Sequence, residues 1–352
     1  VPTNSATASY ENVLEAGFDR FTTCLHGGFD ALDITEREPF RNTLLDGKSE
    51  TGNYAYNSIS VAIDALRDSE RTEFNLVAAP GITNNTLNSK LVRMAESRGD
   101  ALAIIDPQGG FVPNTEGTQS IEDRIGTVDS TVDNMQQNLK LNSSYGAAYY
   151  PWVQIRDNMN GATLWAPASI AAIGALSYSE AVSELWFAPA GFTRGGLSAN
   201  NAGGLPVVGV RQRLTSKERD KLYENNINPI ASFPAEGIVI FGQKTLQTTP
   251  SALDRINVRR LTIFLKREIS RIAATLLFDQ NVKITWNKFR GQAERFLGGV
   301  KSGLGLTDYK VILDESTTTP DLIDRNILYA KIFVKPARAI EFIAIDFVIL
   351  NT

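Results

Sequence analysis

Side chains that act as nucleophiles or general bases are scarce in this 352-residue chain, which has one cysteine, Cys24, and one histidine, His26. The two lie two positions apart on an expected strand, where side chains at that spacing share a face. That placement would allow a thiolate–imidazole pair. The turn Gly27-Gly28 follows at once and no orienting third group is evident. We therefore favour a buried free cysteine over a catalytic dyad.

Carboxylates are the next candidates for chemistry. Asp30 and Asp33, or Glu36 and Glu38, would supply a pair, but no cleft signature accompanies them, so we expect solvated surface. A serine triad would again need the lone histidine, and no G-x-S-x-G elbow exists. One cysteine also excludes a disulfide framework and a zinc site built from several cysteines. We predict no catalytic residue, no metal ligand and no enzyme activity.

Glycine-rich turns raise the question of a phosphate site. Gly195-Gly196 and Gly203-Gly204 match neither G-x-G-x-x-G nor a Walker pattern, and neither directly joins a strand to a helix. The turn at residues 80–83 also lacks the dinucleotide fingerprint. We interpret these glycines as turn formers and predict no cofactor.

The composition is that of a globular protein, with 43% hydrophobic and 21% charged residues and a net charge of −4. No apolar run reaches the roughly 18 residues of a membrane helix, so we predict no membrane insertion. The charge is unevenly distributed: residues 1–146 carry 21 acidic and 11 basic side chains, and residues 251–301 carry 11 basic and 4 acidic. Such asymmetry steers one copy against another or against a charged partner. The start at Val1-Pro2 leads us to expect a fragment or a processed form.

The first part of the chain has the pattern of an α/β fold. Residues 74–81 and 101–107 are predicted to form buried strands, and the intervening helix over 86–98 ends at Gly99, a common helix-stop residue. This predicts a parallel β-α-β unit with a right-handed crossover. Further elements are expected as helices over 54–68 and 120–141 and a strand over 147–155.

The second part changes character after a segment rich in small residues, glycine and proline at 166–209, which favours a hinge or boundary. We predict a multi-domain α/β fold, α+β overall. A sandwich domain spans 1–209, with 1–20 allowed for as a remnant of a preceding domain, and a smaller α+β domain spans 210–352. The remaining expected elements are helices over 168–176, 215–224 (with a Thr215/Glu218 capping box) and 251–278, and strands over 237–242, 327–335 and 338–350.

The helix expected over 251–278 is amphipathic and basic. Leu261, Leu265, Ile269, Ile272 and Leu276 form one apolar stripe at 100° per residue. The cations are expected to line the two flanks of its exposed side: Arg255, Arg259 and Lys266 on one, Arg260, Arg267 and Arg271 on the other. They form either a solvated face or a docking face for an acidic surface. No aromatic platform accompanies them, so direct nucleic-acid binding is not predicted.

The C-terminal segment 338–350 is apolar on both faces and rich in strand-forming residues. A terminal strand of this kind must be covered, because an open edge invites aggregation. It is either an interior strand of its own domain or a strand that completes the sheet of a neighbouring copy. Its candidate linking residues are Ile340, Phe342, Ile343, Ile345, Phe347 and Ile349.

Taken in order, several motifs resemble the C-terminal part of a contractile tail sheath protein of myoviruses. They are 75–82 (NLVAAPGI), 103–107 (AIIDP), 166–169 (APAS), 186–191 (WFAPAG), 228–230 (NPI), 237–246 (GIVIFGQKTL) and 256–261 (INVRRL). Phe241 stands where the family often has tryptophan, and 277–281 matches its aromatic-acidic stretch only in part. The family usually carries more N-terminal sequence, including an arm that pairs with a neighbour's C-terminal strand, and we expect this chain to lack it.

The resemblance implies a structural virion protein without catalysis, assembled in the host cytoplasm. Copies would form hexameric rings that stack helically around a tail tube, and this metastable polymer would contract to drive the tube through the host envelope for genome ejection. The implied partners are other copies of the chain, the tube protein, and baseplate and terminator proteins. The basic helix resembles the element that grips the tube, and the terminal strand resembles the linking arm.

Three alternatives remain open. The chain is also compatible with the sheath of a phage-tail-like bacteriocin or of an extracellular contractile injection system. The other two alternatives are not structural proteins: an α/β enzyme built on residues 74–107 and a soluble binding module for an acidic protein.

Overall fold

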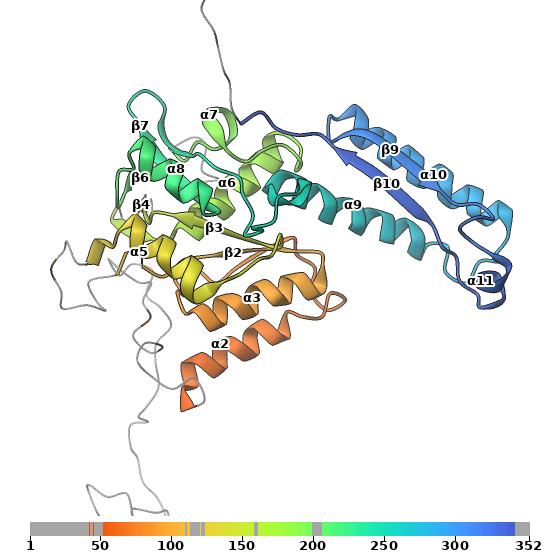
Figure 1. The fold of residues 1–352 in the computed structure, drawn as a ribbon, viewed down its shortest axis with the longest axis horizontal. Coiled ribbons are helices and arrows are strands. Elements are labelled where there is room, and N and C mark those ends of the chain that lie inside the picture. Colours follow the sequence, from red (N-terminus) through yellow and green to blue (C-terminus); the bar gives the residue numbers. More distant parts are fainter. Residues whose placement is uncertain are drawn as a thin grey trace, which may run out of the picture. The chain divides into compact units, whose positions relative to one another are not determined.

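The fold comes from a computed structural model that describes residues 42, 45, 52–109, 111–112, 120, 124–157, 161–198 and 206–341. Within these ranges an α/β body, residues 52–254, is followed by a smaller C-terminal lobe, residues 256–336 (Figure 1). Cys24, His26 and the acidic residues at 30–38 lie outside the described residues, as does the turn Gly203-Gly204. None of the described helices is long and apolar enough to cross a membrane.

A five-stranded sheet forms the centre of the body. Its order is β1 (Leu76–Ala78), β2 (Leu102–Ile105), β3 (Gly146–Tyr150), β7 (Ile227–Phe233) and β8 (Gly237–Ile240). The first four strands are parallel, and β8 is antiparallel to β7. Every residue of β2 and β3 is buried, as expected for parallel strands covered on both faces.

The predicted β-α-β unit is confirmed. β1 and β2 are joined by α3 (Asn85–Arg98), which ends at Gly99 in the left-handed conformation, with φ of 71°. The side chain of Asn84 caps the start of α3 by accepting from the Leu87 N–H at 3.0 Å.

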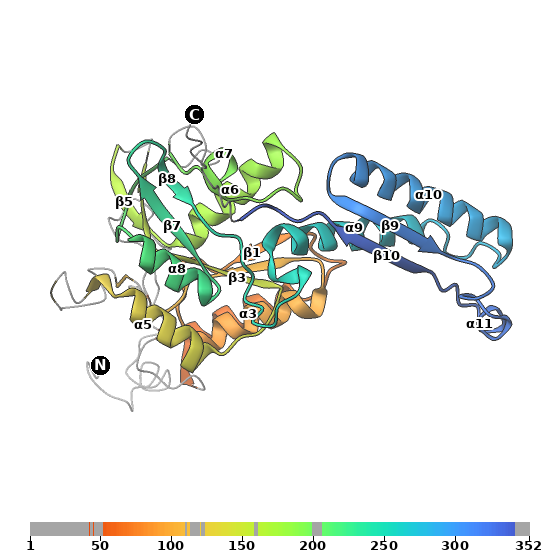
Figure 2. The same cartoon turned by 45° about the horizontal axis from the view of Figure 1, so that its top comes forward.

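Two hydrophobic clusters cover the faces of the sheet, and Figure 2 shows helices on both sides of its strands. On one side lie α2 (Tyr54–Ala65), α3, α5 (Val128–Asp133) and α8 (Ser216–Glu224). On the other side lie α6 (Ala168–Val182) and a three-stranded antiparallel sheet of β5 (Thr163–Ala166), β4 (Val153–Arg156) and β6 (Val207–Val210). The short helix α7 (Gly191–Arg194) precedes the pairing of Gly196 with Val239. The α/β architecture follows the sequence prediction.

Three predicted elements of the body differ from the structure. The helix expected over 120–141 begins at Val128, because Thr127 and Ser130 form a capping box there, and it continues as a π-helix, η2 (Asn134–Leu139). The strand expected over 147–155 is two strands, β3 and β4, in different sheets, separated by Pro151 and Trp152. The helix expected over 168–176 extends to Val182.

The division expected at residue 209/210 falls within the central sheet. β7 and β8 lie beyond that position, yet β7 pairs with β3. The helix predicted from its capping box is present as α8, with Thr215 and Glu218 bonded as expected, and it packs on the same sheet. In the structure, the body therefore includes residues 210–254, which the prediction had assigned to the second domain, because pairing between distant strands leaves no local signal.

The lobe is built from α9 (Ile256–Ala274), α10 (Lys283–Ser302), β9 (Leu306–Ile312), α11 (Pro320–Asp324) and β10 (Lys331–Pro336). A 3-10 turn, η3 (Ala252–Asp254), occupies the start of the helix predicted over 251–278. β9 and β10 are antiparallel, with Ile332 opposite Val311. The described residues 338–341, where a further strand was predicted to begin, contain no strand, and 342–350 lie outside the described part.

Candidate interaction sites

The long helix α9 joins the two parts of the chain. Ile256 and Ile263 belong to the hydrophobic core of the body, whereas Leu261 and Leu265 belong to the core of the lobe. The predicted apolar stripe is confirmed, because Ile269, Ile272 and Leu276 pack on that same lobe core. The first half of α9 is buried on all sides, however, so its partners differ from those of the second half.

Trp186 adds a second contact between body and lobe. It lies in the lobe core, its indole N–H donates to the Gly303 carbonyl at 2.8 Å, and its ring lies 6.0 Å from that of Phe264. A Cβ placed on Gly303 or Gly305 would come within 2.9 or 3.0 Å of the indole. The two glycines therefore make room for this side chain.

Arg259 and Arg260 were predicted to line exposed flanks of the helix, and this is wrong. Their exposed fractions are 5% and 2%. Arg260 donates to the Glu180 carboxylate at 2.6 Å, and Arg259 lies 4.0 Å above the ring of Tyr145 and bonds Ser144. Burial lowers the pKa of both guanidinium groups, with the acidic and phenolic neighbours opposing the shift. Both cations are buried because this half of the helix packs against the body core on one side and the lobe core on the other. Their partners belong to the body, so they anchor α9 there.

The second half of α9 carries the cations Lys266, Arg267 and Arg271. For these three side chains the predicted exposure agrees better with the structure than it does for Arg259 and Arg260. Lys266 and Arg271 are exposed and Arg267 is half-buried. Arg271 bonds Glu73 at 2.5 Å and Glu268 at 3.0 Å, and Arg267 lies 3.8 Å from Glu73. This face is cationic and partly neutralised by its own carboxylates.

Arg255, the remaining predicted cation, faces the end of the described chain. Its Nε and Nη2 donate to the two carboxylate oxygens of Glu341 at 2.6 and 2.9 Å. Gln243 donates to the same carboxylate at 3.1 Å. Ile340, the only predicted linking residue within the described part, has an exposed fraction of 83%. Phe342, Ile343, Ile345, Phe347 and Ile349 lie outside it.

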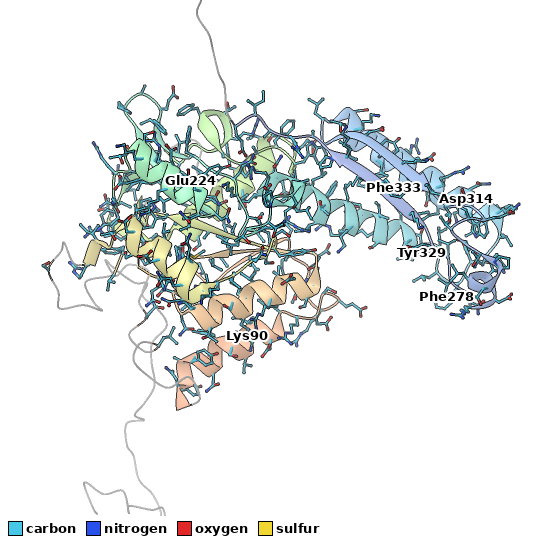
Figure 3. The ribbon with its side chains drawn as sticks, in the orientation of Figure 1. Lys90, Glu224, Phe278, Asp314, Tyr329 and Phe333 are labelled. Atoms are coloured by element: carbon cyan, nitrogen blue, oxygen red, sulfur yellow. The ribbon has the colours of Figure 1, made fainter. Side chains whose placement is uncertain are left out.

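Sequence reasoning missed α10 and the outer face of the β9–β10 sheet. Trp286, Phe289, Ala293, Leu297 and Val300 recur at helical spacing and are buried in the lobe core, a signal that would have identified α10. On the outer face of the sheet, Lys310 lies opposite Phe333, which is 56% exposed and labelled in Figure 3. Lys331 and Lys335 flank Phe333 on β10 and share its face. The lobe therefore has further exposed cations.

Asp106 is the one strongly buried carboxylate among the described residues, with an exposed fraction of 1%. It accepts from the Gly81 N–H at 3.0 Å and from the N–H and hydroxyl of Ser169 at 3.0 and 2.6 Å. Burial raises its pKa, and these hydrogen bonds oppose the rise. The carboxylate joins the turn after β1, the end of β2 and the start of α6. No cluster of three or more potential metal ligands occurs in the described ranges.

The two successive parts of the chain match two family profiles in order. Residues 52–246 match the phage tail sheath protein central domain, and residues 248–349 match the phage tail sheath C-terminal domain. The chain belongs to the phage tail sheath family. The boundary between the profiles lies after β7 and β8 and shortly before η3 and α9, where the chain passes from body to lobe.

Curated relatives support the same assignment. The chain is 29% identical over 316 residues to the tail sheath protein of Enterobacteria phage T4, a match that covers 88% of this chain and 47% of the relative. It is 30% identical over 257 residues to the tail sheath protein of Salmonella phage ViI, covering 73% and 38%. The chain spans about half the length, or less, of the curated relatives it matches.

Solved structures share the fold. A chain from the anti-feeding prophage baseplate, 6-fold symmetrised, has a TM-score of 0.63 at 21% identity, covering 86% of this chain and 74% of that one. A chain of the PVC sheath complex in its contracted state, from an extracellular contractile injection system, has a TM-score of 0.63 at 22% identity, covering 81% and 74%. At this identity the likeness concerns the fold.

Proposed function

We propose that this chain is the structural subunit of a contractile phage tail sheath and has no catalytic role. The observation that carries the proposal is the match of both its parts, in order, to the central and C-terminal domains of phage tail sheath proteins. In this proposal, copies form hexameric rings stacked helically around a tail tube in the virion, and the sheath ends at baseplate and terminator proteins. Contraction draws on the free-energy difference between two packings, summed over many copies.

The sheath proposal is tested by negative-stain electron microscopy of the full-length protein, expressed with and without its tube protein. We expect helically striated cylinders when the tube is present. Dispersed particles under both conditions would overturn the proposal and favour a soluble binding module.

Within this function we propose that the second half of α9 contacts the tube through Lys266, Arg267 and Arg271. Lys266 and Arg271 are the exposed members of the predicted cationic set and Arg267 lies half-buried beside them, whereas Arg259 and Arg260 are buried and Arg255 bonds Glu341. Exposed charges of this kind steer association and are screened by salt. They are therefore expected to bind an acidic tube surface in a salt-sensitive way.

The tube contact is tested by the double reversal Arg267→Glu and Arg271→Glu. We expect weaker assembly on tubes and less dependence on salt than in the parent. A matched reversal of exposed cations on the body, Arg213→Glu and Lys217→Glu, should leave assembly unchanged. Equal assembly of all three proteins would show that the α9 face is merely solvated.

We further propose that the segment from Arg338 onward links one subunit to the next. Its apolar sequence and the 83% exposure of Ile340 support this proposal. Deleting residues 338–352 from the full-length protein should abolish polymerisation while the body stays folded, as measured by sedimentation and circular dichroism. Normal cylinders after the deletion would remove the linking role.

A further inference from the structure

The chain returns from the lobe to the body at its last described residues. β10 ends at Pro336, and the Ala337 N–H donates to the Gly305 carbonyl at 3.1 Å. Residues 338–341 then cross to the body, where Glu341 meets Arg255 and Gln243. Arg255 immediately precedes α9, so the residues that begin and end the lobe are joined across 86 positions of sequence.

The Arg255 side of this contact is held rigidly. Its flanking backbone bonds the segment after β8, with the Ile256 N–H donating to the Gln243 carbonyl at 2.8 Å and the Thr245 N–H to the Asp254 carbonyl at 2.9 Å. Asp254 also pairs with the guanidinium at 3.2 Å. Burial alone would lower the pKa of Arg255, but the hydrogen bond to Glu341 and the nearby charges raise it.

Within the described ranges the crossing segment has few other contacts, one of them a hydrogen bond from the Tyr223 hydroxyl to the Glu341 carboxylate. Hollows of about 540 and 300 Å³ lie beside it, and both are lined by Gln243, Ile340 and Glu341. Ile340 is exposed rather than packed. The position of the segment therefore depends on the Glu341 carboxylate, whose side chain is only 17% exposed.

We propose that Arg255 and Glu341 form a clamp that anchors the root of the terminal segment on the body. The inference rests on the proposed function, because the pull on that segment comes from a second copy of the chain. With the clamp closed, the pull passes to the body. With it open, the pull acts on the end of β10, where Pro336 pairs with Leu306 in the two-stranded sheet. Arg255 and Glu341 are positioning residues for the link between subunits.

The bidentate geometry suits this role. A guanidinium and a carboxylate joined by two parallel hydrogen bonds fix direction as well as distance. Neither lysine at 255 nor glutamine at 341 reproduces both bonds. Loss of one charged hydrogen-bonding partner is expected to increase the released population of the segment about tenfold.

The clamp is tested first in the unassembled full chain, in a Cys24→Ser background. Spin labels at Ile340→Cys and at Glu224→Cys, an exposed body position labelled in Figure 3, report the distance distribution between segment and body. We expect Glu341→Gln to broaden the distribution and the exchange Arg255→Glu with Glu341→Arg to restore it. Glu315→Gln, which removes an exposed pair with Lys283 at 2.6 Å, is the matched control. An unchanged distribution in Glu341→Gln would overturn the clamp, whatever the assembly result.

The transmission of tension is tested in cylinders of the full-length protein. We expect Glu341→Gln cylinders to break into shorter pieces at lower urea concentration than parent cylinders, and the charge exchange to recover their length. Equal length and urea resistance in Glu341→Gln would overturn the role in tension. Absence of cylinders from the parent protein would instead remove the proposed sheath function, while a broadened distance distribution would still establish the clamp.

Discussion

The body and the lobe protect their strands in different ways. In the body, β2 and β3 are buried at every residue between two layers of hydrophobic side chains. In the lobe, every residue of β10 is at least partly exposed, and the β9–β10 sheet packs on α10 through one face. A two-stranded sheet is marginal on its own. The lobe adds to its packing on α10 the elements that it shares with the body: α9, Trp186 and the Arg255–Glu341 clamp.

The largest difference in stability between lobe and body is expected on removing Trp186, which should destabilise the lobe and leave the body unchanged. Trp186→Ala takes a large buried side chain out of the lobe core, and we expect a loss of about 3–5 kcal/mol. Hydrogen exchange should show lost protection in α10 and β9 and unchanged protection in β2 and β3. Trp152→Ala, which removes a tryptophan packed on Phe111 in the body, should give the opposite pattern. Equal losses in both parts would show that body and lobe unfold as one unit.

The two halves of α9 can be compared by removing, for each half, one carboxylate that pairs with an arginine of that half. Glu180→Gln leaves the Arg260 guanidinium buried without its counter-charge, and we expect a loss of about 1–3 kcal/mol, since the glutamate end is partly solvated. Glu73→Gln removes an exposed partner of Arg271 and should cost about 0–1 kcal/mol. Urea unfolding of both variants measures the difference. A larger loss in Glu73→Gln would contradict the distinction between a buried and an accessible half.

Asp106 should make the stability of the body depend on pH. Because its pKa in the folded chain is raised above 3.8, the unfolded chain loses its proton first as the pH rises through this region. Stability is then full below pH 3.8 and falls until the pH passes the raised folded value, by up to about 1.4 kcal/mol per pH unit. Unfolding of the parent relative to Asp106→Asn isolates this group. A parent that gains stability over the variant with rising pH would show that the bonds from Gly81 and Ser169 outweigh burial.

The smallest effect is expected at Phe278, which lies just beyond the end of α9. Phe278 adopts φ of 72° and is fully exposed, so its backbone is unfavourable and its ring makes no compensating burial. Phe278→Asn should stabilise the lobe by about 1 kcal/mol, because asparagine tolerates the left-handed region. Leu277→Asn, an exposed neighbour without that conformation, is the control in thermal unfolding. A destabilised Phe278→Asn would show that the ring is held by contacts.

Local patterns in the sequence were sufficient for much of the body. Gly99 ends α3 because glycine readily takes a left-handed conformation, and Thr215 with Glu218 begins α8 through bonds within one turn. The apolar runs around residues 76 and 102 could be predicted as parallel strands, because strands buried on both faces do not alternate apolar and polar residues. The ordered motifs also carried the resemblance to tail sheath proteins, which the family profiles confirm.

The candidate sites depended on contacts that no local pattern encodes. Periodicity placed Arg259 and Arg260 opposite an apolar stripe, but it could not show that a second core covers that side of α9. In the sequence, Trp186 looks like an ordinary apolar residue of a loop. Only the structure shows that Gly303 and Gly305 lie against its ring. The joining of Arg255 to Glu341 spans 86 positions, and only the return of β10 toward the body brings them together. The sequence by itself therefore determined the β-α-β unit, the start of α8 and the family. Tertiary packing decided which charges are buried, which are accessible and which hold the chain's end, because burial is a property of neighbours distant in sequence.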